Sequence, residues 1–407
     1  MKQIRLILLF AFLSSFAYAQ NSKVEIGLID TVYSNILKEK RPLWIYIPKS
    51  DSFGLYTQEN NEFPVLYLLD AEWHFPFAAG MVHQLSSING NSICPEMIIV
   101  GIQNVDRTRD FTPSYDSQYP TSGGYDKFIS FVGKELIPYI DSAYNVKPYR
   151  MLMGHSLGGL AVINTLLNHT DLFNAYIAVD PSMWWQNQSF LKEAENILQK
   201  KKFNNASLFL GVANSMEKGM DTIRVKSDNT RSTLHIRSAL EFSKFLNRDT
   251  NNLQQFKYNY YANESHASLP LIAFYDALHY LFSFYTLPLS YKDYADSGMT
   301  LAYKIENHYD NVSQRMGYKV SPPEITIYSL ASTALMKNEL ARAKYFFELN
   351  VKNYPNSFNA YDSYGDFLLT VKEEQNAIKM FTKALSIKEN INTRNKLVNL
   401  TRNIQKN

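Results

Sequence analysis

The stretch GHSLG at residues 154–158 decides the fold of this chain, and its flanks give it that weight. Residues 149–153 before it are mostly apolar and have strand character, while residues 159–167 continue as an apolar run typical of a buried helix. A serine between a strand and a helix, with glycine two positions away on either side, indicates a sharp turn that exposes the serine oxygen. The pattern predicts Ser156 as a nucleophile beside the positive end of the following helix. A loop serine that lies between two glycines by chance is the alternative.

This strand–turn–helix unit is the nucleophile elbow of the α/β-hydrolase fold, and the first 290 residues fit such a fold. Apolar runs with strand character alternate with helical segments, which is typical of a parallel sheet covered on both faces. The predicted strands comprise residues 44–48, 65–70, 97–101, 149–153, 175–180, 207–212 and 256–261, and further helices are predicted near 125–139 and 230–246. We predict an α/β fold with a mostly parallel central sheet, in which the strands before residue 50 form an antiparallel edge. Catalytic groups of such sheets gather at the carboxyl ends of the strands.

The last eighty residues differ because they repeat with a period of 34. Ala343 aligns with Ala377 and Phe347 with Phe381, so the spacing A-x-x-x-F occurs twice. This spacing resembles the tetratricopeptide repeat, in which a small alanine lets two helices approach and an aromatic ring fills the groove between units. Two units are fewer than such arrays usually need, so an ordinary pair of helical hairpins is the alternative. We expect the helix near residues 390–405 to cap the array or to lean on the hydrolase domain.

The chain therefore divides into four predicted parts. Residues 1–19 have the basic start, short apolar run and A-x-A site of a secretory signal peptide. Residues 20–290 form the predicted α/β-hydrolase domain, 291–322 the linker, and 323–407 the tetratricopeptide-like helical repeats. Cleavage after Ala19 predicts a periplasmic or secreted protein, and no later segment has the length and apolarity of a membrane span.

Composition argues against several classes of partner. The net charge is +3, and loss of Lys2 and Arg5 with the signal peptide leaves 39 basic against 38 acidic residues. So small an excess gives no reason to propose nucleic acid or an anionic membrane as a partner. Cys94 is the only cysteine, so no internal disulfide can form. The repeats are expected to offer a concave surface for a protein partner or for self-association.

A serine nucleophile needs a general base, and in this fold the order along the chain is serine, acid, histidine. His266 follows the last predicted strand and precedes a leucine-rich helix, so we assign it the role of base, with an exposed loop histidine as the alternative. The acid fixes the tautomer of the imidazole and should follow the strand at 207–212. Glu217 is the first candidate, Asp221 the second and Asp228 the third. Each could instead be a solvated loop acid.

Two backbone amides should stabilise the oxyanion of the tetrahedral intermediate. One is the amide of Leu157, directly after the nucleophile. The other should follow the third strand, at Ala71 or Glu72. Both positions lie where a strand of the predicted sheet ends.

Loops at the same edge of the sheet carry side chains that could bind a substrate. Trp184 and Trp185 could form the wall for an acyl or aromatic group. Arg107 and Arg109 could meet an anionic group of the substrate. Ion pairs with the neighbouring aspartates are an equally good interpretation of these arginines.

These residues together resemble the putative esterase family of α/β-hydrolases, which includes enterochelin esterase-like, feruloyl esterase-like and antigen 85-like proteins. The resemblance spans roughly residues 25–285. Its carrying segments are 66–70, 100–102, 107–113, 154–160, 181–185 and 264–266. It implies Ser156 as nucleophile, His266 as base, and hydrolysis of carboxylic esters or thioesters without a metal or cofactor. The family often has glycine after the third strand where this chain has Ala71, which leaves the second oxyanion donor open.

The sequence thus predicts an exported serine esterase that works through an acyl-enzyme intermediate. Its substrate would be a small-molecule or polysaccharide-linked ester. An acyltransferase on the same scaffold is the first alternative, and a non-catalytic binding protein that acts through its helical repeats is the second. The acyl group, the alcohol, the oligomeric state and the partner of the repeats stay open at this stage.

Overall fold

The computed structural model describes residues 23–48, 62–248, 252–295 and 298–404. The predicted signal peptide at residues 1–19 lies outside this part of the chain. Among the described residues, no helix has both the length and the apolarity needed to span a bilayer.

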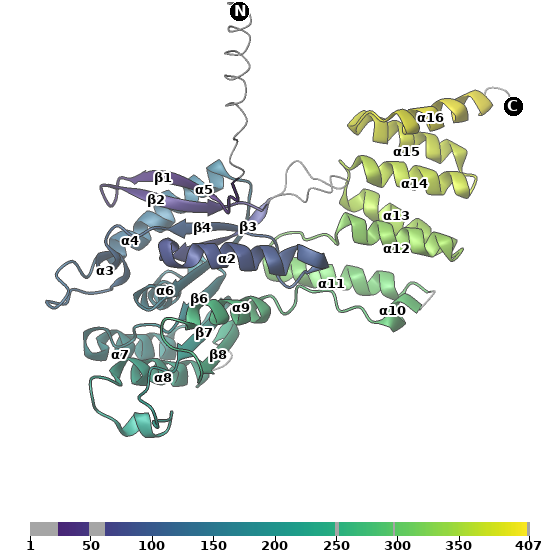
Figure 1. Cartoon of the computed structure of the whole chain (residues 1–407). Helices are drawn as coiled ribbons and strands as arrows, with labels where there is room; N and C mark the ends of the chain where they lie inside the picture. Colours follow the sequence, from purple (N-terminus) through teal and green to yellow (C-terminus); the bar gives the residue numbers. More distant parts are fainter. Residues whose placement is uncertain (1–22, 49–61, 249–251, 296–297, 405–407) are drawn as a thin grey trace, which may run out of the picture.

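One sheet of eight strands forms the centre of the first part of the chain, in the order β1-β2-β4-β3-β5-β6-β7-β8 (Figure 1). β2 pairs antiparallel with β1 and with β4, and all other neighbours are parallel. The strands are β1 Leu28–Ser34, β2 Glu39–Tyr46, β3 Phe63–Leu69, β4 Ile98–Ile102, β5 Val146–His155, β6 Ala175–Val179, β7 Phe203–Ala213 and β8 Leu253–Tyr261. The predicted α/β fold with an antiparallel edge is confirmed.

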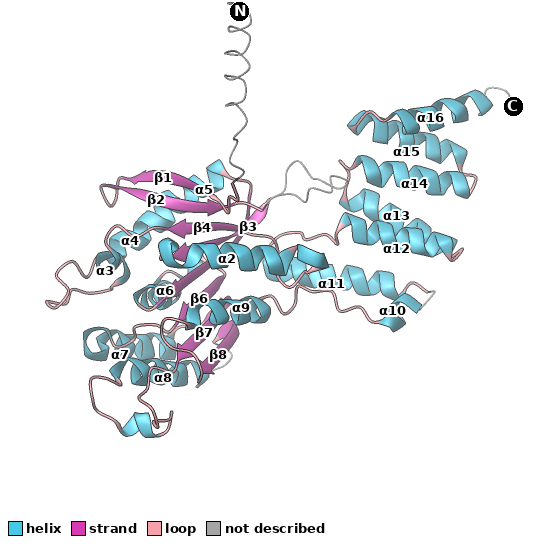
Figure 2. Cartoon of the chain, in the orientation of Figure 1, coloured by secondary structure: helices cyan, strands magenta, loops and turns pink. Residues whose placement is uncertain are grey.

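Helices cover both faces of this sheet, as Figure 2 shows. Side chains alternate across a strand, so Val65, Tyr67 and Leu69 of β3 join one apolar core while Leu66 and Leu68 join the other. The helices of the first core include α4 Tyr125–Phe131, α5 Ile137–Ala143, α6 Leu157–Asn168, α7 Trp185–Lys200 and α8 Leu234–Asn247. Those of the second core include α2 Ala71–Ser86 and α9 Leu269–Leu281. Burial on both faces explains why the central strands are continuously apolar.

The helix predicted near residues 125–139 forms, but with an interruption. A π-helical turn, η2 (Val132–Leu136), separates α4 from α5, and the helical segment extends to Ala143. Three short 3-10 turns (η1 Ile88–Gly90, η3 Thr170–Leu172, η4 Arg224–Ser227) and the five-residue helix α3 (Arg107–Phe111) lie in loops.

The C-terminal region is entirely helical, as predicted. Its helices are α10 Tyr291–Ala295, α11 Thr300–Met316, α12 Glu324–Met336, α13 Leu340–Asn353, α14 Phe358–Thr370, α15 Glu374–Ile387 and α16 Ile391–Ile404. The starts of α12 and α14 are 34 residues apart, and so are the starts of α13 and α15. Ala343 and Ala377 are fully buried at the helix contacts. The helical spacing agrees with the period of the sequence, and the assignment to tetratricopeptide repeats stays a prediction.

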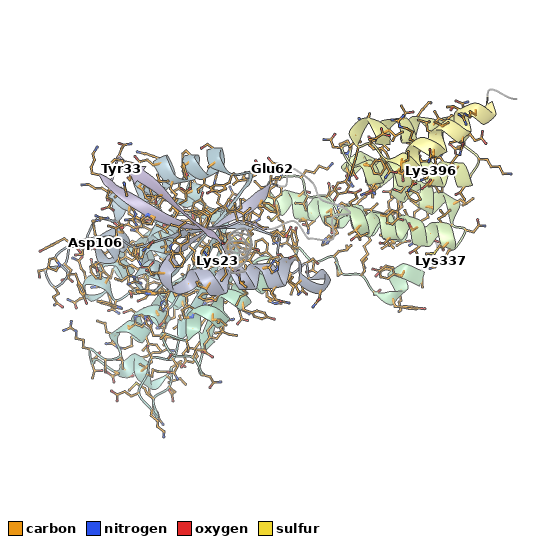
Figure 3. All side chains as sticks on the ribbon, turned by 45° about the horizontal axis from the view of Figure 1, so that its top comes forward. Lys23, Tyr33, Glu62, Asp106, Lys337 and Lys396 are labelled. Carbon is orange, nitrogen blue, oxygen red and sulfur yellow. The ribbon has the colours of Figure 1, made fainter. Side chains whose placement is uncertain are left out.

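Helix α11 belongs to both parts of the molecule. Val312 and Met316 near its end pack into the core beneath α2 and α9. Leu301, Ala302 and Ile305 near its start pack with α12 and α13 instead. The segment predicted as a linker therefore contains a helix that joins the two apolar cores. In Figure 3, Lys337 and Lys396 of the helical region lie at the opposite end of the molecule from Asp106, which directly precedes α3.

Candidate active site

Ser156 stands on a strained turn between β5 and α6. Its backbone has φ 60° and ψ −115°, a conformation that L-residues rarely adopt. Glycine is required at position 154, because a Cβ there would lie 2.4 Å from the carbonyl oxygen of Gly158. The sharp return of the chain that the GHSLG pattern predicts is present.

Hydrogen bonds tie this turn to the loop that follows β6. The amide of Ser156 donates to the carbonyl of Val179 at 3.0 Å, and the carbonyl of Ser156 accepts from the amide of Ser182 at 3.0 Å. The Oγ atoms of Ser156 and Ser182 lie 3.3 Å apart. Ser182 is almost fully buried, so the nucleophile candidate is held against a rigid neighbour.

A pocket of about 460 Å³ opens beside Ser156. Its lining residues are Arg107, Tyr119, Ser156, Leu157, Ser182, Trp184, Trp185, Ser215, Ser232, His235 and His266. Ser156 and His266, which are 110 positions apart in the sequence, thus face one cavity. Ala71, Glu72, Arg109, Glu217 and Asp221 are not among its lining residues.

The carboxylate that contacts His266 is Asp180, at the end of β6. Its Oδ2 lies 2.6 Å from Nδ1 of His266, and its Oδ1 accepts from the amide of Ala213 at 3.1 Å. Asp180 is fully buried. Burial acts to raise the pKa of Asp180, but the hydrogen bonds with His235 and His266 outweigh it and hold that pKa below its usual range.

The carboxylate that contacts His266 thus follows β6, whereas the acid was expected after the strand at 207–212. Glu217 is exposed in the loop beyond β7. Asp221 accepts from the amides of Ile223 and Arg224 at 2.8 Å each, so its carboxylate organises its own loop. Asp228, the third candidate, likewise accepts from the amide of Thr230. The carboxylates of Asp221 and Asp228 are thus engaged by amides of their own loop, and the acid that contacts His266 is Asp180.

Two further histidines, His235 and His155, lie beside His266. His235, in the first turn of α8, places Nε2 2.9 Å from the same Oδ2 of Asp180. The ring of His155 lies 4.4 Å from that of His266, measured between centroids. Burial, followed by the proximity of His266 and His74, lowers the pKa of His155 to about 3. His155 therefore stays neutral at physiological pH.

The candidate oxyanion donors are backbone amides at the starts of two helices, α6 and α2. Leu157 is the first residue of α6 and lines the pocket, and the first amides of a helix have no acceptor within it. Ala71 and Glu72 begin α2 in the same way, directly after Asp70, which has φ 58°. Leu157 lines the pocket, whereas Ala71 and Glu72 do not.

The two arginines have different surroundings. Arg107 lines the pocket, and its Nε and Nη2 donate to Asp70 at 2.7 and 3.0 Å. Nη2 of Arg107 also donates to the carbonyl of His155 at 3.1 Å, which fixes the guanidinium beside the elbow. Arg109 instead forms ion pairs with Glu39 and Asp110. The ion-pair interpretation therefore holds for Arg109, while Arg107 combines an ion pair with access to the pocket.

The tryptophans and a tyrosine form one wall of the pocket. Trp185 is fully buried and donates from Nε1 to the carbonyl of Ser114 at 3.2 Å. Trp184 is partly exposed, with its ring centroid 5.8 Å from that of Trp185. The ring of Tyr119, which the sequence analysis did not single out, lies 5.1 Å from that of Trp185. An aromatic surface of this kind suits an apolar or aromatic group.

One oxygen of Asp180 and one nitrogen each of His235 and His266 lie within 4.8 Å of one another, close enough to be considered as ligands of a metal ion. Their nitrogen–oxygen distances of 2.6 and 2.9 Å are those of direct hydrogen bonds. We therefore interpret the group as a hydrogen-bonded cluster with a proton in each contact.

The sequence model of the putative esterase family matches residues 34–278, more than half of the chain. The chain belongs to this family. The match contains β2 to β8 with the elbow, Asp180, His235 and His266.

Relatives support the same placement. The ferri-bacillibactin esterase BesA of Bacillus subtilis is 33% identical over 165 residues, which cover 35% of this chain and 56% of that protein. The siderophore enterobactin esterase of Emericella nidulans is 28% identical over 155 residues, 33% of this chain and 50% of that protein. The chain thus spans about half the length of these curated relatives.

Among solved structures, an IroE-like serine hydrolase from Shewanella oneidensis is similar with a TM-score of 0.65 and 28% identity. The superposition covers 80% of this chain and 98% of that protein. The similarity to this structure therefore covers more of the chain than residues 34–278, which the family model matches.

Proposed function

We propose that this protein is a serine esterase in which Ser156, His266 and Asp180 form the catalytic triad. The observation that carries the proposal is the contact between Asp180 and His266 in a pocket that also exposes Ser156. Membership of the esterase family supports the reaction class. The proposal departs from the sequence analysis only in the acid, where Asp180 replaces Glu217 and Asp221.

The tautomers follow from the charge of Asp180. An ionised carboxylate can only accept hydrogen bonds, so Nδ1 of His266 carries the proton and donates to it. Nε2 of His266 then has a free lone pair, which takes the proton of the Ser156 hydroxyl as its oxygen attacks the ester carbonyl. The same imidazolium returns the proton to the leaving alcohol, and an acyl-enzyme remains. Water then attacks the acyl-enzyme with the help of the same histidine, and the carboxylic acid product is released.

The developing oxyanion is stabilised by fixed donors. The amide of Leu157 supplies one, reinforced by the positive end of α6. For the second donor we retain the amides of Ala71 and Glu72 at the start of α2 as candidates. Both amides lie in the first turn of α2 and have no acceptor within that helix.

The substrate that fits this pocket is an ester with an aromatic or bulky apolar part. Trp184, Trp185 and Tyr119 supply the apolar wall, and the guanidinium of Arg107, which is paired with Asp70, also lines the pocket. The names of BesA and of the Emericella enzyme describe siderophore esterases. We therefore propose siderophore-type esters as the first substrates to test.

The remaining predictions concern the rest of the chain. We propose that the signal peptide directs the protein to the periplasm or outside the cell. We also propose that the helical region after residue 323 forms tetratricopeptide-like repeats that bind a protein partner. No residue of that region lines the pocket, so the repeats would act by recruitment.

The direct test compares the wild-type protein with Ser156→Ala on a small aryl ester. We expect turnover to fall at least about 10³-fold, since the nucleophile is removed, and labelling by a fluorophosphonate to disappear. Product analysis with added alcohols separates hydrolysis from acyl transfer. Full activity of Ser156→Ala would refute the proposal.

A further inference from the structure

His235 has no part in the triad, yet it contacts the triad's carboxylate. The geometry points to His235 as a positioning residue that shares Asp180 with His266 and thereby sets the basicity of His266. This inference rests on the proposed function, because it assumes that His266 is the base.

Both imidazoles meet the same oxygen of Asp180. Nδ1 of His266 lies 2.6 Å and Nε2 of His235 2.9 Å from Oδ2, while Oδ1 is used by the amide of Ala213. The carboxylate is fully buried, so water does not compete for these positions. Since the ionised oxygen accepts from both rings, each histidine is fixed in one tautomer by the same acid.

The second donor changes the electrostatics of the base. A hydrogen bond from His235 stabilises the negative charge of Asp180 and spreads it over two partners. Less of that charge is then available to stabilise the imidazolium of His266. Removal of the His235 donor should therefore favour the imidazolium form of His266.

His235 also limits how Asp180 can move. Asp180 has φ 42°, a strained backbone conformation that its contacts must hold in place. His235 belongs to α8, and its side chain is 20% exposed. His266 lies in a loop, and its side chain is 40% exposed. The helical partner thus fixes the carboxylate that orients the loop partner.

The other charged or titratable groups around His266 are few. The ring of His155, at the end of β5, is tilted by 41° to the ring of His266, and its low pKa keeps His155 neutral. Arg107 lines the same pocket from α3 but is paired with Asp70. Glu264, in the loop of His266 itself, accepts from Ser268. His235 is the group among them that shares an acid with the base.

The test uses two substitutions in the full-length protein. His235→Phe removes the donor, and His235→Gln retains a neutral N–H near the position of Nε2. For His235→Phe we expect kcat/KM to fall about 10-fold with KM changed less than about 3-fold, since only orientation is lost. The acidic midpoint of the kcat/KM profile should rise by about 0.5–1 pH unit, because His266 becomes more basic. His235→Gln should keep the midpoint of the wild-type protein.

His279→Phe is the matched control. His279 also lies on a helix, α9, and its buried Nε2 has no hydrogen-bond partner among the described residues. The same substitution there should leave the midpoint unchanged. An unchanged midpoint in His235→Phe, or equal losses in the Phe and Gln variants without any shift, would overturn the inference.

A second measurement separates this inference from the proposed function. Histidine-selective labelling allows the pKa of His266 to be followed by NMR in Ser156→Ala protein, with and without His235→Phe. We expect the same upward shift there. If wild-type protein shows no Ser156-dependent turnover, the proposed function fails, while the NMR titration still decides whether His235 tunes His266.

Discussion

The sheet domain and the helical region build their contacts over very different distances in the sequence. In the helical region, Gly365 of α14 meets Phe381 of α15, only 16 residues away. In the sheet domain, the candidate site joins Ser156, Asp180, His235 and His266, which come from four separate elements. A local repeat can therefore be recognised from its period, whereas the partners in the site depend on where the loops after the strands turn.

Loss of the base gives the largest expected effect and is confined to the sheet domain. His266→Ala removes the proton acceptor for Ser156, so kcat should fall at least about 10³-fold. His235 still contacts the buried carboxylate of Asp180 in this variant, so the thermal midpoint should change little. Steady-state kinetics and a melting curve on the same sample check both statements. A large loss of stability would mean that the loop also supports the fold.

A single methyl group added at Gly365 should lower the stability of the helical region without affecting catalysis in the sheet domain. A Cβ on Gly365 would lie 2.5 Å from the ring of Phe381, which is fully buried and cannot yield easily. Gly365→Ala should destabilise the helical region by about 1–3 kcal/mol through overpacking, with unchanged kcat/KM. Chemical denaturation followed by circular dichroism measures the first quantity.

The control for this substitution lies in the sheet domain. Gly80, inside α2, has nothing within 4 Å of the position of an added Cβ. Gly80→Ala should stabilise the protein by roughly 0.5–1 kcal/mol, because alanine is the better helix former. Destabilisation by both substitutions to the same extent would contradict the packing described for Gly365.

A pH dependence of stability should originate at His155. Its native pKa of about 3 lies below the value of about 6.5 in an unfolded chain. Between these values the unfolded state binds a proton that the native state does not, so the free energy of unfolding falls on acidification. His155→Phe should reduce this slope by up to about 1.4 kcal/mol per pH unit. Denaturation at pH 7 and pH 4.5 measures it, and an unchanged slope would show that His155 is not held neutral by burial.

Most of the fold could be predicted from the sequence because strands that are buried on both faces are continuous apolar runs. β3 and β6 are continuous apolar runs, and the GHSLG turn needs glycine at position 154 for a steric reason visible in the letters. The 34-residue period likewise follows from small residues at helix contacts. These features depend on neighbours in the sequence or on simple periodicity.

The proposed acid could not be predicted in the same way. The rule of chain order points to the loop after β7, but Asp221 of that loop accepts hydrogen bonds from the amides of Ile223 and Arg224. Asp180 directly follows β6 and reads as the end of a strand. The signal that could have found it is its position at the carboxyl end of a strand beside the elbow, where this fold gathers catalytic groups. Nothing in the sequence around His235 indicated its contact with Asp180, because the residue lies within an ordinary helical pattern 55 positions away.

The central claim is that Asp180, and no acid of the loop after β7, orients His266. The most direct measurement compares kcat/KM of Asp180→Asn with that of Glu217→Gln and Asp221→Asn on one aryl ester. The account predicts a fall of about 10²–10⁴-fold for Asp180→Asn, since an amide no longer holds His266 in the required tautomer, and a change of less than about 3-fold for the other two. A large loss in Glu217→Gln or Asp221→Asn, with Asp180→Asn still active, would contradict it.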